Sequence, residues 1–383
     1  MQVTFQGSSK VKTAAQYEKV HRIDSKDFPA LDLIRFLAAL AVLLMHARNS
    51  TWVDFARLPP TQHNEIVAAF FFLTRLGKEA VILFFVLSGY LVGGGVVDRI
   101  SNCNFQLSLY AADRISRIWT PLLPAVGLAV IVGLAVGTPP VNWKDVSGSA
   151  LGLNGILTAT IVQNGPLWSL SYEIWFYVLA GAAGVFLSRN LGSILALIAI
   201  LICVIVFSYL SPIYLLFWIA GALVRRIKVE RISWSLLILG TFSLISGLMI
   251  SQISAQSNAL RGALALPKDL GLSLVCAGFC LLIPILVSAR SSSILAPIAR
   301  IARFLSSFSY SLYLTHWPIL LLFHIHFKKS FAIDFYSVGL FIAKVATSIL
   351  FSYLFFLATE RNTSAIRSWL RLRLRNISGE VPN

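Results

Sequence analysis

Apolar residues form long blocks along this chain, separated by short polar segments. A helix needs about 17 to 25 predominantly apolar residues to cross a bilayer core, because each residue advances it by about 1.5 Å. Ten blocks approach this length, near residues 30–47, 79–97, 118–136, 168–188, 192–208, 211–224, 233–251, 269–288, 304–326 and 334–358. The pattern predicts an all-α fold, a polytopic membrane helix bundle with about ten transmembrane helices.

The composition is that of a chain with lipid as its solvent. Of its 383 residues, 57% are hydrophobic and only 13% are charged, and the mean hydropathy is +0.77. These values exclude an ordinary soluble globular protein. We expect an N-terminal tail at 1–29, a transmembrane domain at 30–358 and a basic C-terminal tail at 359–383. The first span lacks a small-residue cleavage site after its apolar run, so we expect it to stay in the mature protein.

The chain has a formal net charge of +16, which could suggest a nucleic-acid partner. Its basic residues, however, lie mainly in the loops on one side of the predicted membrane, which argues against that partner. If the N-terminus is cytoplasmic, the inside segments hold 21 Lys and Arg residues and the outside segments hold 9. The positive-inside rule then predicts both termini in the cytoplasm. The tail from Arg367 to Arg375 adds an attraction to anionic inner-leaflet lipid.

The cysteines and the outer loops carry little information about chemistry. Cys276 and Cys280 share one helix face, where packing is favoured over metal binding, and no metal site is expected. The longest outside loops, 48–78 and 137–167, contain apolar stretches. These loops are either interfacial or re-entrant helices that cover a site, or plain connectors.

A stripe of residues on the first span holds the strongest candidates for chemistry. Asp32, Arg35, Ala39, Val42 and His46 fall within an arc of about 80° at 100° per residue. Arg35 and His46 therefore point the same way, about 16 Å apart along the helix axis. Asp32 lies one turn before Arg35 and can neutralise or orient it. An ionisable group inside a span usually has a partner and a purpose, because burying it costs several kcal/mol.

The predicted direction of this helix suggests a division of roles. Arg35 lies toward the cytoplasmic end, where a guanidinium could hold the phosphate of an anionic donor. His46 lies in the outer half, where a neutral imidazole could take the proton of an acceptor hydroxyl. The alternative is an intramembrane arginine whose charge and hydrogen bonds are satisfied by its neighbours, together with a histidine near the interface. This alternative would leave the shared helix face unexplained.

The fourth span carries a carboxylate that fits the same chemistry. Ser169, Glu173 and Tyr177 are spaced by four and share a face. We expect Glu173 at a depth comparable to His46, where it would fix the imidazole tautomer and stabilise the imidazolium. The alternative is a glutamate near the helix start that is hydrogen-bonded to neighbouring hydroxyls.

Five segments in chain order resemble motifs of the membrane-bound acyltransferase family 3, which includes O-acetyltransferases of bacterial polysaccharides, O-antigens and nodulation factors. The first contains the family's signature of an arginine, ten residues and a histidine, and the fourth contains its PLWSL segment ending in Glu. They are Leu31 to Ala39 followed by His46, Val81 to Tyr90, Arg114 to Arg117 followed by Pro121, Pro166 to Glu173, and Phe308 to His316. One segment alone would be weak, whereas five in order are strong.

The resemblance implies an O-acyltransferase of the bacterial inner (plasma) membrane. The expected donor is cytoplasmic acetyl-CoA or another acyl-CoA, the expected acceptor is a hydroxyl of a carbohydrate outside, and membrane lipid is the other partner. No permanently bound cofactor is expected. The resemblance assigns catalysis to His46, Glu173 and Arg35, and binding of the donor phosphates to Arg35, Arg114 and Arg117. Arg114 and Arg117 also fit ordinary positive-inside residues at a helix end.

Further candidates line the expected pocket: Asp32, Ser88, Trp168, Ser169, Tyr313 and His316. His316, just before Pro318, either lines that pocket or packs in a kinked helix. Ser88 and Gly89 are expected to permit close helix packing. Direct transfer to the acceptor is favoured, and an acyl-enzyme on His46 stays open.

Two other classes of function compete with acyl transfer. A transporter or flippase of a lipid-linked saccharide also carries intramembrane charges, but the chain lacks repeated halves and paired broken spans. A membrane sensor or scaffold would leave the alignment of Arg35 with His46 unexplained.

Overall fold

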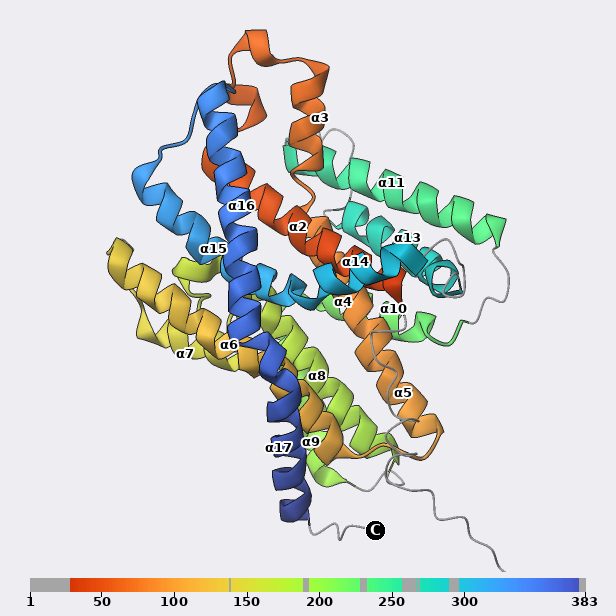
Figure 1. Cartoon of the computed structure of the whole chain (residues 1–383). Helices are drawn as coiled ribbons and strands as arrows, with labels where there is room; N and C mark the ends of the chain where they lie inside the picture. Colours follow the sequence, from red (N-terminus) through yellow and green to blue (C-terminus); the bar gives the residue numbers. More distant parts are fainter. Residues whose placement is uncertain are drawn as a thin grey trace, which may run out of the picture.

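The computed structural model describes residues 28–137, 139–188, 193–227, 233–256, 267, 269–288 and 296–378, and it is a bundle of helices (Figure 1). The α-helices are α2 (Pro29–Thr51), α3 (Glu65–Leu73), α4 (Gly77–Ser88), α5 (Gly94–Ser101), α6 (Leu107–Val136), α7 (Trp143–Leu151), α8 (Trp168–Ser188), α9 (Ile194–Tyr209), α10 (Pro212–Val224), α11 (Trp234–Gln256), α13 (Leu270–Ser288), α14 (Ala296–Ser307), α15 (Ser309–His326), α16 (Phe335–Ala358) and α17 (Thr363–Ser378). Within these ranges there is no strand, so the all-α class is confirmed.

Each predicted span coincides with helix in the described chain. Seven helical segments are long and apolar enough to cross a membrane, whereas α9 and α10 are shorter apolar helices. The predicted span 304–326 is divided at Phe308 between α14 and α15. The protein is therefore a multi-pass membrane protein. The predicted N-terminal tail lies outside the described residues except for its last two, and most of the predicted C-terminal tail forms α17.

Helix α2 runs through the middle of the bundle, where α4, α14, α15 and α16 pack against it. Its interior contains neither glycine nor proline after Pro29, so no kink interrupts it. Helix α15 runs parallel to α2, since Phe36 near the start of α2 contacts Phe308 and His46 near its end contacts His316. The two helices thus connect the same two ends of the bundle.

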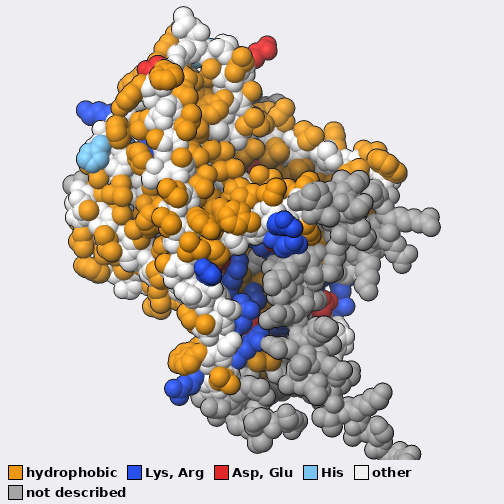
Figure 2. Space-filling view, viewed as in Figure 1, with side chains coloured by type: hydrophobic (Ala, Val, Ile, Leu, Met, Phe, Trp, Pro, Cys, Tyr) orange, Lys and Arg blue, Asp and Glu red, His pale blue; other side chains and the backbone are white. Residues whose placement is uncertain are grey.

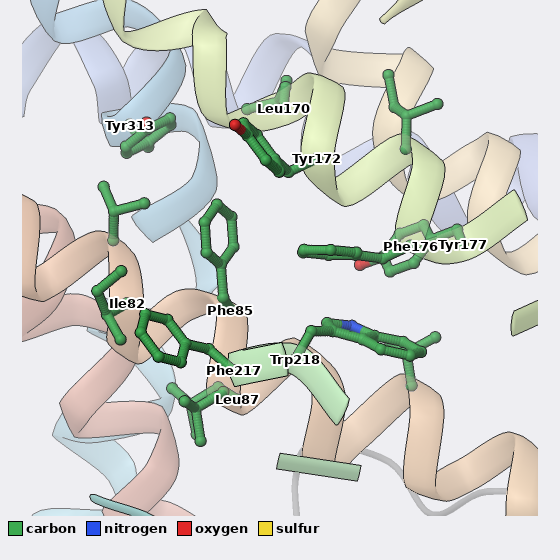
Figure 3. Close-up of a cluster of buried hydrophobic side chains, with 14 of the residues drawn as sticks. Ile82, Phe85, Leu87, Leu170, Tyr172, Phe176, Tyr177, Phe217, Trp218 and Tyr313 are labelled. Carbon is green, nitrogen blue, oxygen red and sulfur yellow. The ribbon is translucent and has the colours of Figure 1, made fainter. Parts of the chain in front are cut away.

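Aromatic side chains fix the position of α8 beside α4 and α10. The ring of Phe176 stacks on Trp218 at 5.3 Å and on Phe207 at 5.6 Å, and Phe85 meets it edge to face at 5.4 Å (Figure 3). Such pairs add to the free energy of apolar burial. This packing holds the helix that carries Ser169, Glu173 and Tyr177.

Two glycines let α10 touch the end of α4 backbone to backbone. A Cβ atom on Gly89 would collide with the carbonyl oxygen of Trp218, and one on Gly221 would collide with that of Val86. The crossing coincides with a π-helical turn at Gly89–Gly93, a feature that widens a helix locally. The expectation that Gly89 permits close packing is confirmed.

Replacing Gly221 by alanine should therefore destabilise the bundle. Its new methyl group meets rigid backbone rather than a movable side chain, and overpacking of this kind costs roughly 1–3 kcal/mol. Thermal unfolding in detergent measures the loss. Gly95→Ala is the matched control, because a Cβ there has no neighbour within 4 Å; equal melting temperatures for the two variants would contradict the backbone contact.

Candidate active site

Helix α2 carries candidate chemistry at both of its ends. Asp32 and Arg35 lie in its first two turns, and His46 lies in its last two turns. The unbroken helix places Arg35 and His46 about 16 Å apart along its axis. We call the two surroundings the arginine end and the histidine end.

At the arginine end, the half-buried Arg35 belongs to a compact polar triangle. Its Nη1 lies 3.1 Å from Asp32 Oδ1 and donates to Ser306 Oγ over 3.1 Å, and Ser306 Oγ donates to Asp32 over 3.2 Å. Asp32 and Ser306 are both buried. The predicted pairing of Asp32 with Arg35 is thus formed, with α14 supplying the third member.

Arg117 lies close enough to Arg35 for the two charges to interact. Its Nη1 is 3.5 Å from the buried carboxylate of Glu360, which also accepts hydrogen bonds from the backbone and the hydroxyl of Ser311. The guanidinium faces the ring of Tyr310 at 5.8 Å. The hydroxyl of Tyr310 is buried without a hydrogen-bond partner.

Arg114 is held by aromatic rings. Its guanidinium lies 5.3 Å from the ring centre of Tyr177 and 6.0 Å from that of Tyr110. The Tyr177 hydroxyl donates to Glu173 over 2.5 Å, so Glu173 belongs to this group. The structure therefore brings Arg35, Arg114, Arg117 and Glu173 together.

The structure does not bring Glu173 and His46 together. Ser169, one turn before Glu173 on α8, is the residue that reaches Tyr313, with 2.6 Å between the two hydroxyl oxygens. Glu173 lies one turn further on, where it interacts electrostatically with Tyr310 and Arg117. Helix α8 starts at Trp168 and runs antiparallel to α15, so each turn along α8 leads from the histidine end toward the arginine end. Glu173 therefore lies at the depth of the arginine end.

At the histidine end, three rings gather. The ring of His46 stacks on that of His316, with 5.3 Å between centroids and 27° between planes, and Trp317 meets it edge-on at 4.8 Å. His46 is half-buried and His316 is fully buried. The sequence predicted His316 as a pocket candidate, and the structure places it beside the proposed base.

The hydrogen bond of His316 defines its tautomer. Its Nδ1 lies 3.0 Å from the carbonyl oxygen of Leu312, which can only accept, so Nδ1 carries the proton. The neutral ring then has a lone pair on Nε2, and no group of the described residues donates a hydrogen bond to this buried atom. A buried acceptor without a donor is costly and needs an explanation.

A cavity of about 410 Å³ opens beside His46. His46 and Trp317 line it together with Asn49, Ser50, Leu320, Leu321, His324 and Lys329. Arg35 is not among these lining residues. The cavity thus gives a ligand access to His46 from one side of the bundle, while Arg35 lies in separate surroundings.

Lys344 of α16 holds the end of α2 next to this cavity. Its buried ammonium group donates to the carbonyl oxygen of Ser50 over 2.8 Å, and to the hydroxyls of Ser50 and Thr51 over 3.2 Å each. A cation is favourable at a helix C-terminus, where carbonyl groups lack partners. Lys344 therefore fixes the turn of α2 that follows His46.

The other sequence candidates lie between or beside the two ends. Ser88 accepts a hydrogen bond from the indole of Trp218, and Trp168 packs in the aromatic cluster with Phe85 and Tyr214. Tyr313 also donates to the carbonyl oxygen of Pro166 over 2.8 Å. Tyr313 is thus the candidate that separates the arginine end from the histidine end.

Sequence reasoning missed several members of both ends. Tyr310 could have been found, because it lies three residues before Tyr313 on the face that His316 continues. Lys344 could also have been singled out as a charge inside a predicted span. The partners of Lys344 and Glu360 could not, since they come from helices distant in sequence.

Comparison with known proteins shows the family of the chain. An acyltransferase domain matches residues 28–357, and the chain therefore belongs to acyltransferase family 3. Among curated proteins, acyltransferase MdmB of Streptomyces mycarofaciens is 31% identical over 156 residues, which are 39% of this chain. The matched part spans only 37% of that relative's length. No solved structure matches the chain significantly.

Replacing Lys344 by methionine should loosen the end of α2. The carbonyl oxygen of Ser50 loses its donor in a buried setting, which costs about 2 kcal/mol. Thermal unfolding in detergent measures this loss. Lys328→Met, at an exposed position, should leave the melting temperature unchanged, and an unchanged Lys344→Met protein would argue against the cap.

Proposed function

We propose that this protein is an O-acyltransferase that moves an acetyl group from acetyl-CoA to a hydroxyl of a cell-surface or exported carbohydrate. The observation that carries the proposal is α2, which holds Arg35 in a polar group at one end and His46 at a cavity at the other. Membership of acyltransferase family 3 supports the class of reaction. The distribution of basic residues favours a location of the arginine end on the cytoplasmic side of the bacterial inner membrane.

The arginine end suits the donor, because acyl-CoA carries phosphate groups on a long thioester arm. Arg35, Arg114 and Arg117 offer guanidinium groups that match phosphate geometry. In the proposal, Glu173 orients Arg114 through Tyr177. Glu173 accepts a hydrogen bond from the Tyr177 hydroxyl, and the Tyr177 ring packs on Arg114. Glu173 would then act at the donor rather than on His46.

The histidine end suits the acceptor. In the proposed step, a ring nitrogen of His46 takes the proton of the acceptor hydroxyl while its oxygen attacks the thioester carbonyl carbon. The ester C–O bond forms, the C–S bond breaks, and the imidazolium returns its proton to the CoA thiolate. The thioester arm must pass Tyr313 to reach His46, so this side chain moves during the reaction.

His316 takes the supporting role that the sequence had assigned to Glu173. Its free Nε2 lone pair can accept a hydrogen bond from protonated His46 after a small rotation of the stacked rings. A neutral partner in an apolar setting stabilises the imidazolium without adding a buried charge. His316 is therefore proposed as a positioning residue for the base.

The cavity fits a sugar better than a purely apolar ligand. Trp317 supplies an indole at its wall, and Asn49 and Ser50 supply hydrogen-bonding groups. Such a mixture of an apolar wall and a few polar groups is typical of small-molecule sites. These residues support a carbohydrate acceptor that enters opposite the donor.

Substituting His46 by alanine should abolish acetyl transfer. The protein reconstituted in vesicles is given labelled acetyl-CoA and an envelope glycan, and CoA release that depends on the glycan is measured. A transporter or flippase would give no such release. His326→Ala, at an exposed position of α15, serves as the control; unchanged turnover in the His46→Ala protein would refute the role of His46 as base.

Substituting His316 by phenylalanine keeps a ring beside His46 but removes the Nε2 lone pair. We expect kcat to fall about a hundredfold, within the range for loss of proton-transfer assistance, with KM for both substrates nearly unchanged. The pH profile of kcat should shift as well. A loss of thermal stability with normal kcat in the surviving protein would instead indicate a packing role.

A further inference from the structure

Helix α17 brings additional arginines to the arginine end. It packs along α6 (Figure 1), and α17 itself follows the segment that matches the acyltransferase domain. Asp113 of α6 forms ion pairs with two arginines of α17: its Oδ1 lies 2.8 Å from Arg371 Nη2 and 3.8 Å from Arg367 Nε. Helix α17 is therefore docked on the bundle.

Arg99 of α5 and Arg114 of α6 complete a cluster of four arginines around Asp113. Arg99 interacts electrostatically with Asp113, Arg114 and Arg371, and Arg367 interacts with Arg114 and Arg117. Figure 2 shows Lys and Arg side chains gathered in a band below the broad apolar region of this face. The cluster thus adjoins the proposed donor site.

The charges of this cluster are not balanced. Among the described residues, the cluster has one carboxylate of its own: Asp113 pairs with Arg367 and Arg371. Asp113 also interacts with Arg99, which in turn lies near Arg114. The nearby carboxylates of Asp32, Glu173 and Glu360 are already engaged by Arg35, Tyr177 and Arg117. Four guanidinium groups around one carboxylate repel one another unless a further anion joins them.

The hydrogen bonds are also incomplete. The Nε atoms of Arg114, Arg367 and Arg371 are all buried without a hydrogen-bond partner. The Nε atoms of Arg114 and Arg371 have no acceptor among the described residues, and that of Arg367 has only its 3.8 Å ion pair with Asp113. The side chains of Arg367 and Arg371 nevertheless stay 35% and 37% exposed, so a ligand can reach them. Unsatisfied donors on adjacent arginines point to a missing ligand with several acceptor oxygens.

We propose that Arg99, Arg114, Arg367 and Arg371 form a polyphosphate site that holds the nucleotide end of the thioester donor, with α17 closing it. This inference rests on the proposed function, because it extends the donor site to the C-terminal helix. Phosphate oxygens satisfy the free Nε atoms and neutralise the excess charge. A phospholipid headgroup offers the same chemistry, and the experiment below separates the two sources.

The test compares two donors in nanodiscs of phosphatidylcholine. Acetyl-CoA carries phosphates, whereas S-acetylpantetheine presents the same thioester arm without them. The double variant Arg367→Gln/Arg371→Gln should bind CoA at least tenfold more weakly, as expected for lost charge-assisted hydrogen bonds. Its turnover of S-acetylpantetheine should equal that of the unmodified protein.

Two controls separate binding from docking of the helix. Arg361→Gln/Arg373→Gln removes the same charge from exposed positions and should leave CoA affinity unchanged. Asp113→Asn removes the carboxylate that pairs with both arginines and should bind CoA as tightly as, or more tightly than, the unmodified protein.

The following outcomes overturn the inference. These arginines only hold α17 if the Arg367/Arg371 variant binds CoA as tightly as the unmodified protein, or if its turnover falls equally with both donors. The same holds if Asp113→Asn lowers the CoA affinity as much as the double variant does. A second set of nanodiscs contains anionic phosphatidylglycerol; if the double variant keeps its CoA affinity but no longer retains this lipid, the site holds a lipid headgroup instead. An unmodified protein that turns over neither donor refutes the proposed function itself, whereas one that turns over both while the variant matches it refutes only this site.

Discussion

A guanidinium group enclosed by helices must find its acceptors among its neighbours, and this constraint organises the protein. Arg35 meets it with Asp32 from its own helix and with Ser306 from α14. The triangle ties the start of α2 to the segment just before α15. Once those starts are joined, the parallel course of the two helices brings their later residues into contact as well.

That alignment explains the stacking of His46 on His316. Arg35 and His46 are separated by eleven residues on α2, and Ser306 and His316 by ten residues across the break at Phe308. The buried apolar residues Ala39, Val42 and Leu43 fill the interval on α2. Lys344 then holds the far end of α2, so His46 is fixed from both sides.

Much of this arrangement follows from the sequence because it lies within single helices. The stripe of Asp32, Arg35 and His46, the pairing of Asp32 with Arg35, and the close packing at Gly89 are consequences of helical periodicity and residue size. The helical nature of each predicted span follows from apolar block length. These features need no knowledge of how one helix meets another.

The features that the sequence could not supply depend on relations between helices. The depth of Glu173 is set by where α8 begins and by the contact of Ser169 with Tyr313, neither of which periodicity reveals. Glu360 joins Arg117 only because the chain turns after α16. The pairing of Arg367 and Arg371 with Asp113 likewise joins α17 to α6, two helices distant in sequence.

Tyr313 has a consequence for the cell that houses this protein. Its hydroxyl is bonded to Ser169 and to Pro166, and its ring lies between Phe84 and His316. A continuous water-filled passage from Arg35 to His46 would let protons leak across the membrane and dissipate the proton gradient. In the proposed mechanism, this phenol blocks such a passage at rest and moves aside only when the thioester passes.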